Sequence, residues 1–116
     1  MTPKRRFFGV TAGTKLITVG GAIASDVHGK NHHLVGCFSN FVHSLNLMLP
    51  NGEIINCSKS KNKELFNATC GGMGLTGFIL NAKIKLVKIK SKNVVQKTIK
   101  TSSLEEIFNC FEENKN

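Results

Sequence analysis

The chain has 116 residues, 41% of them hydrophobic and 20% charged, which is typical of one globular domain or part of one. This length does not accommodate a full dinucleotide site together with a separate substrate domain. The formal charge is +9, but apart from Lys4-Arg5-Arg6 the basic residues are scattered, and the chain has no Trp or Tyr. Because aromatic residues do not alternate with basic ones, the composition favours solvated lysine faces over a nucleic-acid-binding surface.

The cysteines and the N-terminus bear on the cellular compartment. None of the four cysteines forms a C-x-x-C pair, which argues against a zinc ribbon or a redox dithiol and favours free thiols in a reducing compartment. No apolar run has transmembrane length, and no signal-type apolar region follows the basic N-terminus. The sequence therefore predicts a cytoplasmic protein without a transmembrane segment.

The first third of the chain is predicted to be mostly loop. Residues 1–13 are basic and irregular, and residues 16–19 predict a short strand that enters the pair Gly20-Gly21. Small residues at 22–25 indicate a helical turn. Residues 26–40 are polar and punctuated by glycine, which indicates a loop.

A β-hairpin is predicted next. Apolar and polar residues alternate over 41–49, and this period of two places His43 on the same face as Leu45. The sequence Pro50-Asn51-Gly52 is a turn signal because Asn and Gly tolerate positive φ. Residues 53–58 then return as the second strand.

The second half is predicted to contain two helices and two strands. Asn62 is a candidate cap for a helix over 63–69. Alternation over 78–88 predicts a strand whose buried face carries Phe78, Leu80, Ala82, Ile84 and Leu86. Residues 93–101 are expected to form another strand. A capping box over 103–106 then opens an amphipathic helix. We expect its apolar stripe to be packed; the stripe comprises Leu104, Ile107, Phe108 and Phe111.

One glycine-rich segment imitates a dinucleotide fingerprint. Residues 72–77 spell G-x-G-x-x-G, which in the Rossmann fold follows a strand and opens a helix, with an acidic residue about 20 positions on. Here a predicted helix precedes the glycines, a predicted strand follows them, and residues 96–98 are Gln, Lys and Thr. The pattern argues against a Rossmann site. It leaves two alternatives: a tight turn that lets helix and strand pack closely, or a turn lining one side of a cofactor held elsewhere.

The segment TVGGAIASDVHGKNHH, residues 18–33, predicts a cofactor-holding loop. Gly20-Gly21 carries no side chains, so its N–H groups can approach a phosphate, and Thr14 and Thr18 supply hydroxyls. Small residues around Asp26 and His28 allow a large flat ligand to lie close to the backbone. On spacing alone, a glycine-rich turn without a ligand remains an alternative.

The four histidines raise the question of a metal site. The motif H-E-x-x-H is absent, and His28 and His32 lie in a predicted loop that does not align their rings as a helix would. The pattern therefore favours His28 as a group beside a cofactor or substrate. There it would orient a reacting hydroxyl or act as an acid or base near neutral pH.

Four motifs, in order, resemble one family. They are VTAGTK at 10–15, TVGGAIASDVHGKNHH at 18–33, SLNLMLPNGEI at 44–54 and ELFNATCGGMGLTGFI at 64–79. They resemble FAD-linked oxidoreductases of the vanillyl-alcohol-oxidase type, which carry a PCMH-type flavin-binding domain. Within that family they are most similar to the group of decaprenylphosphoryl-β-D-ribose 2-oxidase. The resemblance implies an α+β fold, part of a PCMH-type FAD-binding domain with a mostly antiparallel sheet and short flanking helices, and FAD as cofactor.

The resemblance also implies roles for individual residues. The positions that match contacts to the flavin's phosphates and ribityl chain are Gly13, Thr18, Val19, Gly20 and Gly21, beside the hydroxyl of Thr14. The positions that match the isoalloxazine side are Ser25, Asp26, Val27 and His28. His28 lies nearest the substrate pocket and is the candidate catalytic residue, while Ile79 matches a further flavin contact.

The family pattern further implies that the chain is a fragment. Residues 1–92 correspond to a partial FAD-binding domain without its N-terminal phosphate-loop subdomain, and residues 93–116 to the start of a truncated substrate domain. The implied parent reaction is oxidation of a sugar or alcohol by hydride transfer to FAD, with a companion chain carrying the missing halves. The alternatives are a complete small FAD module serving a separate protein, a non-enzymatic basic binding protein, and an inert remnant of a split gene.

Overall fold

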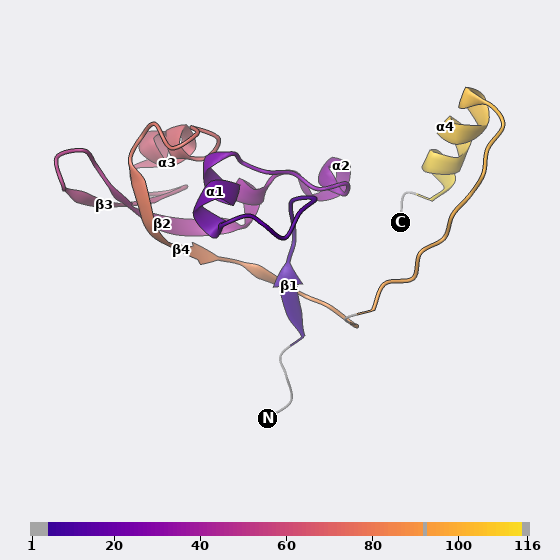
Figure 1. The fold of residues 1–116 in the computed structure, drawn as a ribbon, viewed down its shortest axis with the longest axis horizontal. Coiled ribbons are helices and arrows are strands. Elements are labelled where there is room, and N and C mark those ends of the chain that lie inside the picture. The colour runs from indigo at the N-terminus through magenta and orange to yellow at the C-terminus, as the bar shows by residue number, and fades with distance from the viewer. Residues whose placement is uncertain (1–4, 92, 115–116) are drawn as a thin grey trace.

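The computed structural model describes residues 5–91 and 93–114 as an α+β body from which a C-terminal arm projects (Figure 1). Every strand pairing in this part of the chain is antiparallel, which confirms the expected fold class. The elements in chain order are β1 (Arg6–Phe8), α1 (Val19–Ala24), α2 (His32–Val35), the 3-10 helix η1 (Phe38–Phe41), β2 (Val42–Met48), β3 (Ile54–Ser58), α3 (Lys63–Thr69), β4 (Phe78–Ile84), β5 (Leu86–Lys88) and α4 (Leu104–Glu113).

A three-stranded sheet in the order β3–β2–β4 forms the centre of the body. The hairpin of β2 and β3 is confirmed, and its turn uses Gly52 at φ +84°, which glycine adopts without steric cost. The predicted helix at 63–69 is also confirmed. Its N-cap residue Asn62 makes no side-chain cap and instead donates from Nδ2 to the Asn56 carbonyl at 2.9 Å.

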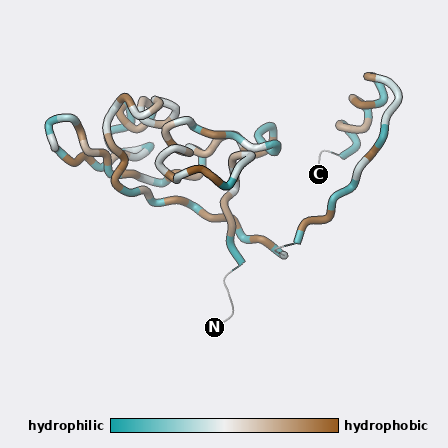
Figure 2. The backbone as a smooth tube through the Cα atoms, in the orientation of Figure 1, coloured by the Kyte–Doolittle hydropathy of each residue, from teal (hydrophilic) through white to brown (hydrophobic). Residues whose placement is uncertain are grey.

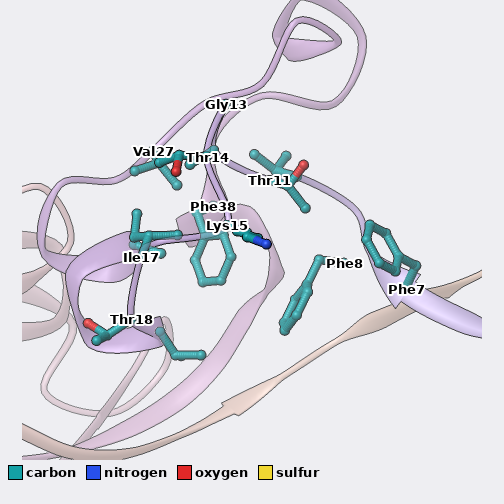
Figure 3. A pocket seen from close by; sticks show the side chains of 14 residues that line it. Phe7, Phe8, Thr11, Gly13, Thr14, Lys15, Ile17, Thr18, Val27 and Phe38 are labelled. Atoms are coloured by element: carbon teal, nitrogen blue, oxygen red, sulfur yellow. The ribbon is translucent and has the colours of Figure 1, made fainter.

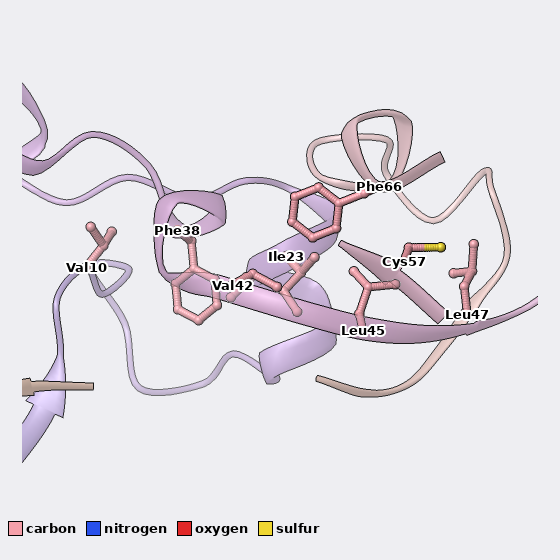
Figure 4. Packing of buried hydrophobic residues seen from close by; sticks show 9 residues of the cluster. Val10, Ile23, Phe38, Val42, Leu45, Leu47, Cys57 and Phe66 are labelled. Atoms are coloured by element: carbon pink, nitrogen blue, oxygen red, sulfur yellow. The ribbon is translucent and has the colours of Figure 1, made fainter. Parts of the chain in front are cut away.

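The core lies between this sheet and the helices α1 and α3. Ile23 of α1 and Phe66 of α3 project toward the side chains of β2, and both are fully buried (Figure 4). Burial of one such side chain contributes roughly 1.5–3 kcal/mol. Because isolated short helices are marginal in water, this packing is what maintains the six-residue α1. The buried apolar cluster comprises Val10, Ala22, Ile23, Phe38, Val42, Leu45, Leu47, Cys57 and Phe66.

Two register irregularities change the predicted faces at one end of β2 and of β4, while Leu45, Leu47, Ala82 and Ile84 lie on the core side as expected. The pairing shifts between Val42 and Ser44, so Val42 is buried and His43 is exposed, although alternation placed His43 with the buried leucines. A second shift places Leu80 outside the regular pairs, and Phe78 and Leu80 are exposed. Each bulge inserts one residue and so inverts a period-two pattern.

The strand predicted at residues 16–19 is wrong. Thr18 is extended, and its hydroxyl caps α1 by accepting from the Gly21 N–H at 3.0 Å, so the chain enters a helix at Val19. Within the predicted irregular segment 1–13, residues 1–4 lie outside the described residues, while β1 forms and pairs with β5.

The predicted loop at 26–40 is more ordered than expected. It contains the short helices α2 and η1. A lone bridge joins His28 and Cys37 across the segment.

The C-terminal predictions hold for the helix and fail for the strand. Residues 93–101 form no strand, and the single strand expected over 78–88 divides at Lys85 into β4 and β5. Ser103 caps α4 as predicted, accepting from the Glu106 N–H at 3.2 Å. The apolar stripe of α4 is largely unpacked: Leu104, Phe108 and Phe111 are 60–68% exposed, whereas Ile107 is half-buried.

Candidate functional site

Residues 7–19 border two adjoining hollows on the body. The first, of about 410 Å³, lies between β1, the segment 10–19 and η1 (Figure 3). The second, of about 690 Å³, lies between that segment and residues 28–31. Gly13 lines both hollows, and so do its neighbours Thr11 and Ala12. One stretch of chain thus forms a shared wall that a long ligand can follow.

Aromatic rings form the apolar side of the first hollow. The ring centroids of Phe8 and Phe38 are 6.0 Å apart, and those of Phe7 and Phe8 are 6.2 Å apart in an edge-on arrangement. Phe38 is buried, whereas Phe7 and Phe8 are exposed and face the opening (Figure 3). Such a wall suits a ligand with a flat or apolar part.

The N-terminus of α1 forms the polar side of the first hollow. Within the described residues, the backbone N–H groups of Val19 and Gly20 have no hydrogen-bond partner. The Thr18 hydroxyl accepts from Gly21 and still has its own proton to donate. Lys15 also lines this hollow (Figure 3). Unpaired N–H groups, a hydroxyl and an ammonium group are donors that suit a phosphate.

Two glycines leave space where a side chain would stand. A Cβ added at Gly13 or Gly20 would meet no protein atom within 4 Å. A Cβ added at Gly21 would come within 3.1 Å of the Thr18 hydroxyl oxygen, so Gly21 serves the cap of α1. No protein atom fills the space beside Gly13 or Gly20, and Gly13 lines both hollows.

His28 belongs to the second hollow, with Gly29, Lys30 and Asn31. Its backbone pairs with Cys37, and its ring centroid lies 5.2 Å from that of His32. Asn31 donates from Nδ2 to the Gly9 carbonyl at 3.1 Å and so ties this loop to the segment after β1. The His28 side chain is exposed, which leaves its imidazole accessible to a substrate.

Comparison with known proteins decides the family. Residues 1–58, half of the chain, match the family model of the FAD binding domain. The chain belongs to this family of FAD-binding domains. FAD is its cofactor.

Several curated relatives match much of this FAD-binding domain. It is 44% identical over 98 residues to a decaprenylphosphoryl-beta-D-ribose oxidase of Mycolicibacterium smegmatis, covering 84% of this chain and 21% of the relative. It is 31% identical over 74 residues to the human Delta(24)-sterol reductase, covering 64% of this chain and 14% of that protein. It is 36% identical over 77 residues to a cytokinin dehydrogenase 3 of Oryza sativa subsp. japonica, covering 66% of this chain and 14% of that protein. The chain thus spans about a fifth of these relatives' length or less.

Some residues of the predicted set line the two hollows, and their contacts with the flavin stay a prediction. The first hollow gathers Gly13, Thr14, Thr18, Val19 and Val27, and the second gathers Gly13 and His28. Gly20 and Gly21 are adjacent, in the first turn of α1. The first hollow has hydroxyl, amide and ammonium donors on one side and aromatic rings on the other. This combination fits a dinucleotide such as FAD, which has phosphates and flat rings.

Asp26 and Ser25 have structural roles at the end of α1. Both carboxylate oxygens of Asp26 are engaged by Ser39, whose N–H and hydroxyl donate at 2.8 and 3.0 Å. Asp26 adopts φ +40°, so the chain reverses there toward η1. Ser25 is the C-cap residue, and its N–H donates to the Gly21 and Ile23 carbonyls. Neither residue lines the two hollows.

The second glycine loop is a turn that braces α1. It follows α3 and precedes β4, which confirms that it is not a Rossmann fingerprint. Its N–H groups at Gly71 and Met73 donate to the Ile23 and Ala24 carbonyls at 3.0 and 2.8 Å. A Cβ at Gly72 would clash with the Ala68 carbonyl, so close packing of helix and loop requires glycine there.

Ile79, just after this loop, packs against the buried core and lines neither hollow. It pairs with Leu47 in the sheet. Its predicted flavin contact stays a prediction.

Sequence reasoning missed Lys15 and the aromatic wall. Lys15 directly follows the A-G-T segment at 12–14, and Phe7-Phe8 lies a few residues before it, so closeness in sequence to a predicted ligand loop was the available signal. Lys30 of the second hollow was likewise not selected. What the sequence did not reveal is the β1–β5 pairing, which brings the two phenylalanines to the hollow.

The cysteines lie outside the donor set. Burial raises the pKa of the Cys70 thiol to about 11, the Asp26 carboxylate adds to the rise, and Lys59 opposes it. Burial also raises the pKa of Cys57. Across residues 5–91 and 93–114, no three His, Cys, Asp or Glu side chains gather as a metal site. In the same ranges no helix has the length and apolar character to cross a membrane.

Proposed function

We propose that the chain supplies one wall of the FAD site of a flavin-dependent oxidoreductase. The observation that carries this proposal is the shared wall at Gly13, with phosphate-type donors in one hollow and an accessible imidazole in the other. The relatives support the same class, because two are named as an oxidase and a dehydrogenase. When bound, FAD supplies the hydride acceptor.

The first hollow holds the phosphate part of the cofactor in this proposal. Its donors are the N–H groups of Val19 and Gly20, the Thr18 hydroxyl and the Lys15 ammonium group. Helix N-termini favour anions by roughly 0.3–1 kcal/mol when exposed, and a lysine adds a point charge. Gly13 and Gly20 let the ligand approach because no Cβ occupies the space.

His28 acts on the substrate in this proposal. An alcohol or sugar that loses a hydride from carbon must also lose its hydroxyl proton, and His28 is the exposed base of the second hollow. The mycobacterial relative is named for a ribose derivative, which supports a sugar or alcohol as the substrate class. His28 therefore orients the hydroxyl and accepts its proton.

The chain needs a companion segment to complete the site. Both hollows are open to solvent, and apolar side chains that line the first one are exposed, including Phe7, Phe8 and Val19. If the hollows stay open, water reaches the bound ligand and side reactions are not prevented. We propose that residues 5–91 provide a partial FAD-binding domain, that residues 93–114 begin a second domain, and that a companion chain covers the open side.

Flavin binding by the purified chain tests the proposal. Titration of FAD against the chain, followed by flavin fluorescence, gives the affinity. Gly20→Val places its Cβ where no protein atom lies within 4 Å and adds a branched side chain to the first turn of α1, so under this proposal we expect binding at least about tenfold weaker. The matched control is Ala68→Val on the exposed side of α3, for which we expect unchanged affinity. Equal binding by the two variants, with both folded by circular dichroism, would contradict the phosphate assignment.

A further inference from the structure

The central sheet has one covered face and one bare face. The helices α1 and α3 pack on the face of β2 that carries Leu45 and Leu47. On the opposite face, directly paired residues point the same way and form rows across the strands. The row at the hairpin end is Ile54–Met48–Phe78.

This row is apolar, although a bare sheet face is ordinarily polar. Ile54, Met48 and Phe78 are 59%, 37% and 67% exposed, and the adjacent Leu80 is 42% exposed. We call these four residues the apolar row. The next two rows are polar, as expected for a wet face, and comprise Asn56–Asn46–Asn81 and Ser58–Ser44–Lys83. The apolar row is therefore a local surface of the kind that contacts a partner.

The arm carries a surface of the matching kind. The stripe of α4 presents Leu104, Phe108 and Phe111 to solvent. Four of the seven acidic residues of the chain lie in this helix, at 105, 106, 112 and 113, and the helix contains no Lys or Arg. The rest of the chain is strongly basic, and Lys83 stands on the same sheet face as the apolar row. An acidic amphipathic helix and an apolar face on a basic body are complementary in both hydrophobicity and charge.

The two surfaces do not meet within one chain. The arm holds α4 away from the sheet (Figure 1). Hydrophobic and hydrophilic residues alternate along the arm (Figure 2). The radius of gyration is 17.8 Å, whereas about 13 Å is expected for a compact domain of this size. A fully extended chain spans about 3.3–3.6 Å per residue, so residues 93–103 can carry α4 beyond the body of their own chain.

We propose that two copies of this chain form a dimer by exchanging α4. The α4 stripe of one copy lies on the apolar row of the other, with acidic residues near the other copy's Lys83, and the second contact is the same by symmetry. Each copy carries both halves of the interface, which is the requirement for a closed twofold assembly. The proposal involves no flavin group and stands apart from the proposed function.

Sedimentation of the full 116-residue chain tests this exchange. We expect the wild-type chain to convert from monomer to dimer as its concentration rises. Phe108→Glu places a charge in the stripe and should weaken dimerisation at least tenfold. Asn109→Glu adds the same charge to α4 beside the stripe and should leave it unchanged within about threefold. Phe78→Glu on the sheet should act like Phe108→Glu, with Asn67→Glu on α3 as its control.

Mixing the two weakened variants distinguishes exchange from other arrangements. The Phe108→Glu chain keeps an intact sheet face, and the Phe78→Glu chain keeps an intact α4, so a mixture retains one good contact. We expect the mixture to associate more tightly than either variant alone, with both folded by circular dichroism. A wild-type chain that stays monomeric, a mixture without recovery, or a monomer that co-sediments with phosphatidylglycerol vesicles through Phe78 would each overturn the proposal.

Discussion

Asp26 shows at the scale of one residue how this loop is positioned. Sequence patterns placed it beside a ligand, but its carboxylate is engaged by the Ser39 N–H and hydroxyl. These two bonds join the end of α1 to η1 and so fix the backbone that leads to His28. Asp26 thus acts on the proposed site by positioning its neighbours.

Replacing this carboxylate should destabilise the fold. Asp26→Asn keeps a side chain that tolerates φ +40° and removes the charge, so it weakens two charge-assisted hydrogen bonds. We expect a loss of about 1–3 kcal/mol in the free energy of unfolding, measured with urea. Ser39→Ala removes the hydroxyl bond alone and should cost less. A loss from Asp26→Asn no larger than that from Ser39→Ala would contradict the role given to the backbone bond.

The Cys70 thiol makes stability fall at alkaline pH. Its pKa in the folded chain is about 11, against an ordinary value of 9.0, because burial disfavours the thiolate. The unfolded chain therefore releases this proton first, so the stabilisation is complete below pH 9 and is lost as pH rises from 9 to 11. We expect Cys70→Ala to flatten this part of the stability curve relative to the wild type. Parallel curves for the two proteins over that range would be inconsistent with the assignment.

At the scale of elements, the second glycine loop connects α3, α1 and β4. It leaves α3, donates to the last carbonyls of α1, and enters β4 at Gly77. Gly77 adopts φ +148°, and a Cβ there would come within 2.5 Å of the Met48 carbonyl oxygen. The glycines of this loop hold α1 in place behind the proposed phosphate donors.

Two glycine substitutions separate strain from collision in this loop. Gly74→Ala meets open space and suffers only the strain of φ +83°, so we expect a cost of about 1–2 kcal/mol. Gly77→Ala adds the collision with β2 and should cost at least about 1 kcal/mol more. Thermal unfolding of both variants measures the difference. Equal melting temperatures would show that the close approach at Met48 carries no energetic weight.

Local signals predicted the elements well where one rule applied. The turn at Gly52 and the Ser103 cap follow from residue types within a few positions, whereas the helix at 63–69 has the expected bounds although Asn62 makes no side-chain cap. The faces predicted for His43 in β2 and for Phe78 in β4 were wrong. The bulges that change them, near His43 and Leu80, arise from pairing between strands distant in sequence. The strand expected at 16–19 failed because Thr18 is a cap, and a cap and a β-branched strand residue look alike in one sequence.

The candidate site was predictable in part for the same reason. Thr18, the glycine pair and His28 lie within the short segment 18–28, so one motif contains them, and the structure brings Thr18 and His28 to the two hollows. Phe8 and Phe38 are distant in sequence and meet only because β1 pairs with β5. No periodicity in the chain encodes that contact.

The whole molecule is an extended body and arm that leaves apolar surface uncovered. Its radius of gyration of 17.8 Å and the exposed stripe of α4 show that the described residues do not form one compact body.

Ligand binding to the folded state should raise the stability of the chain, since binding adds RT ln(1 + [L]/Kd) to the free energy of unfolding. With FAD at 100 times its Kd, we expect stabilisation of about 2.7 kcal/mol, seen as a higher melting temperature. An unchanged melting temperature under those conditions would contradict binding to the native fold.

The central claim is that FAD lies along the wall formed by Gly13 and the first turn of α1. The most direct measurement is a titration of the ¹⁵N-labelled chain with FAD, followed through its backbone amide resonances. We predict that the amides of Gly13, Val19, Gly20 and His28 shift together and saturably, while those of Asn56 and Asn81 on the bare sheet face stay fixed. Shifts confined to the bare sheet face or to α4, with the amides of the wall unmoved, would contradict the account.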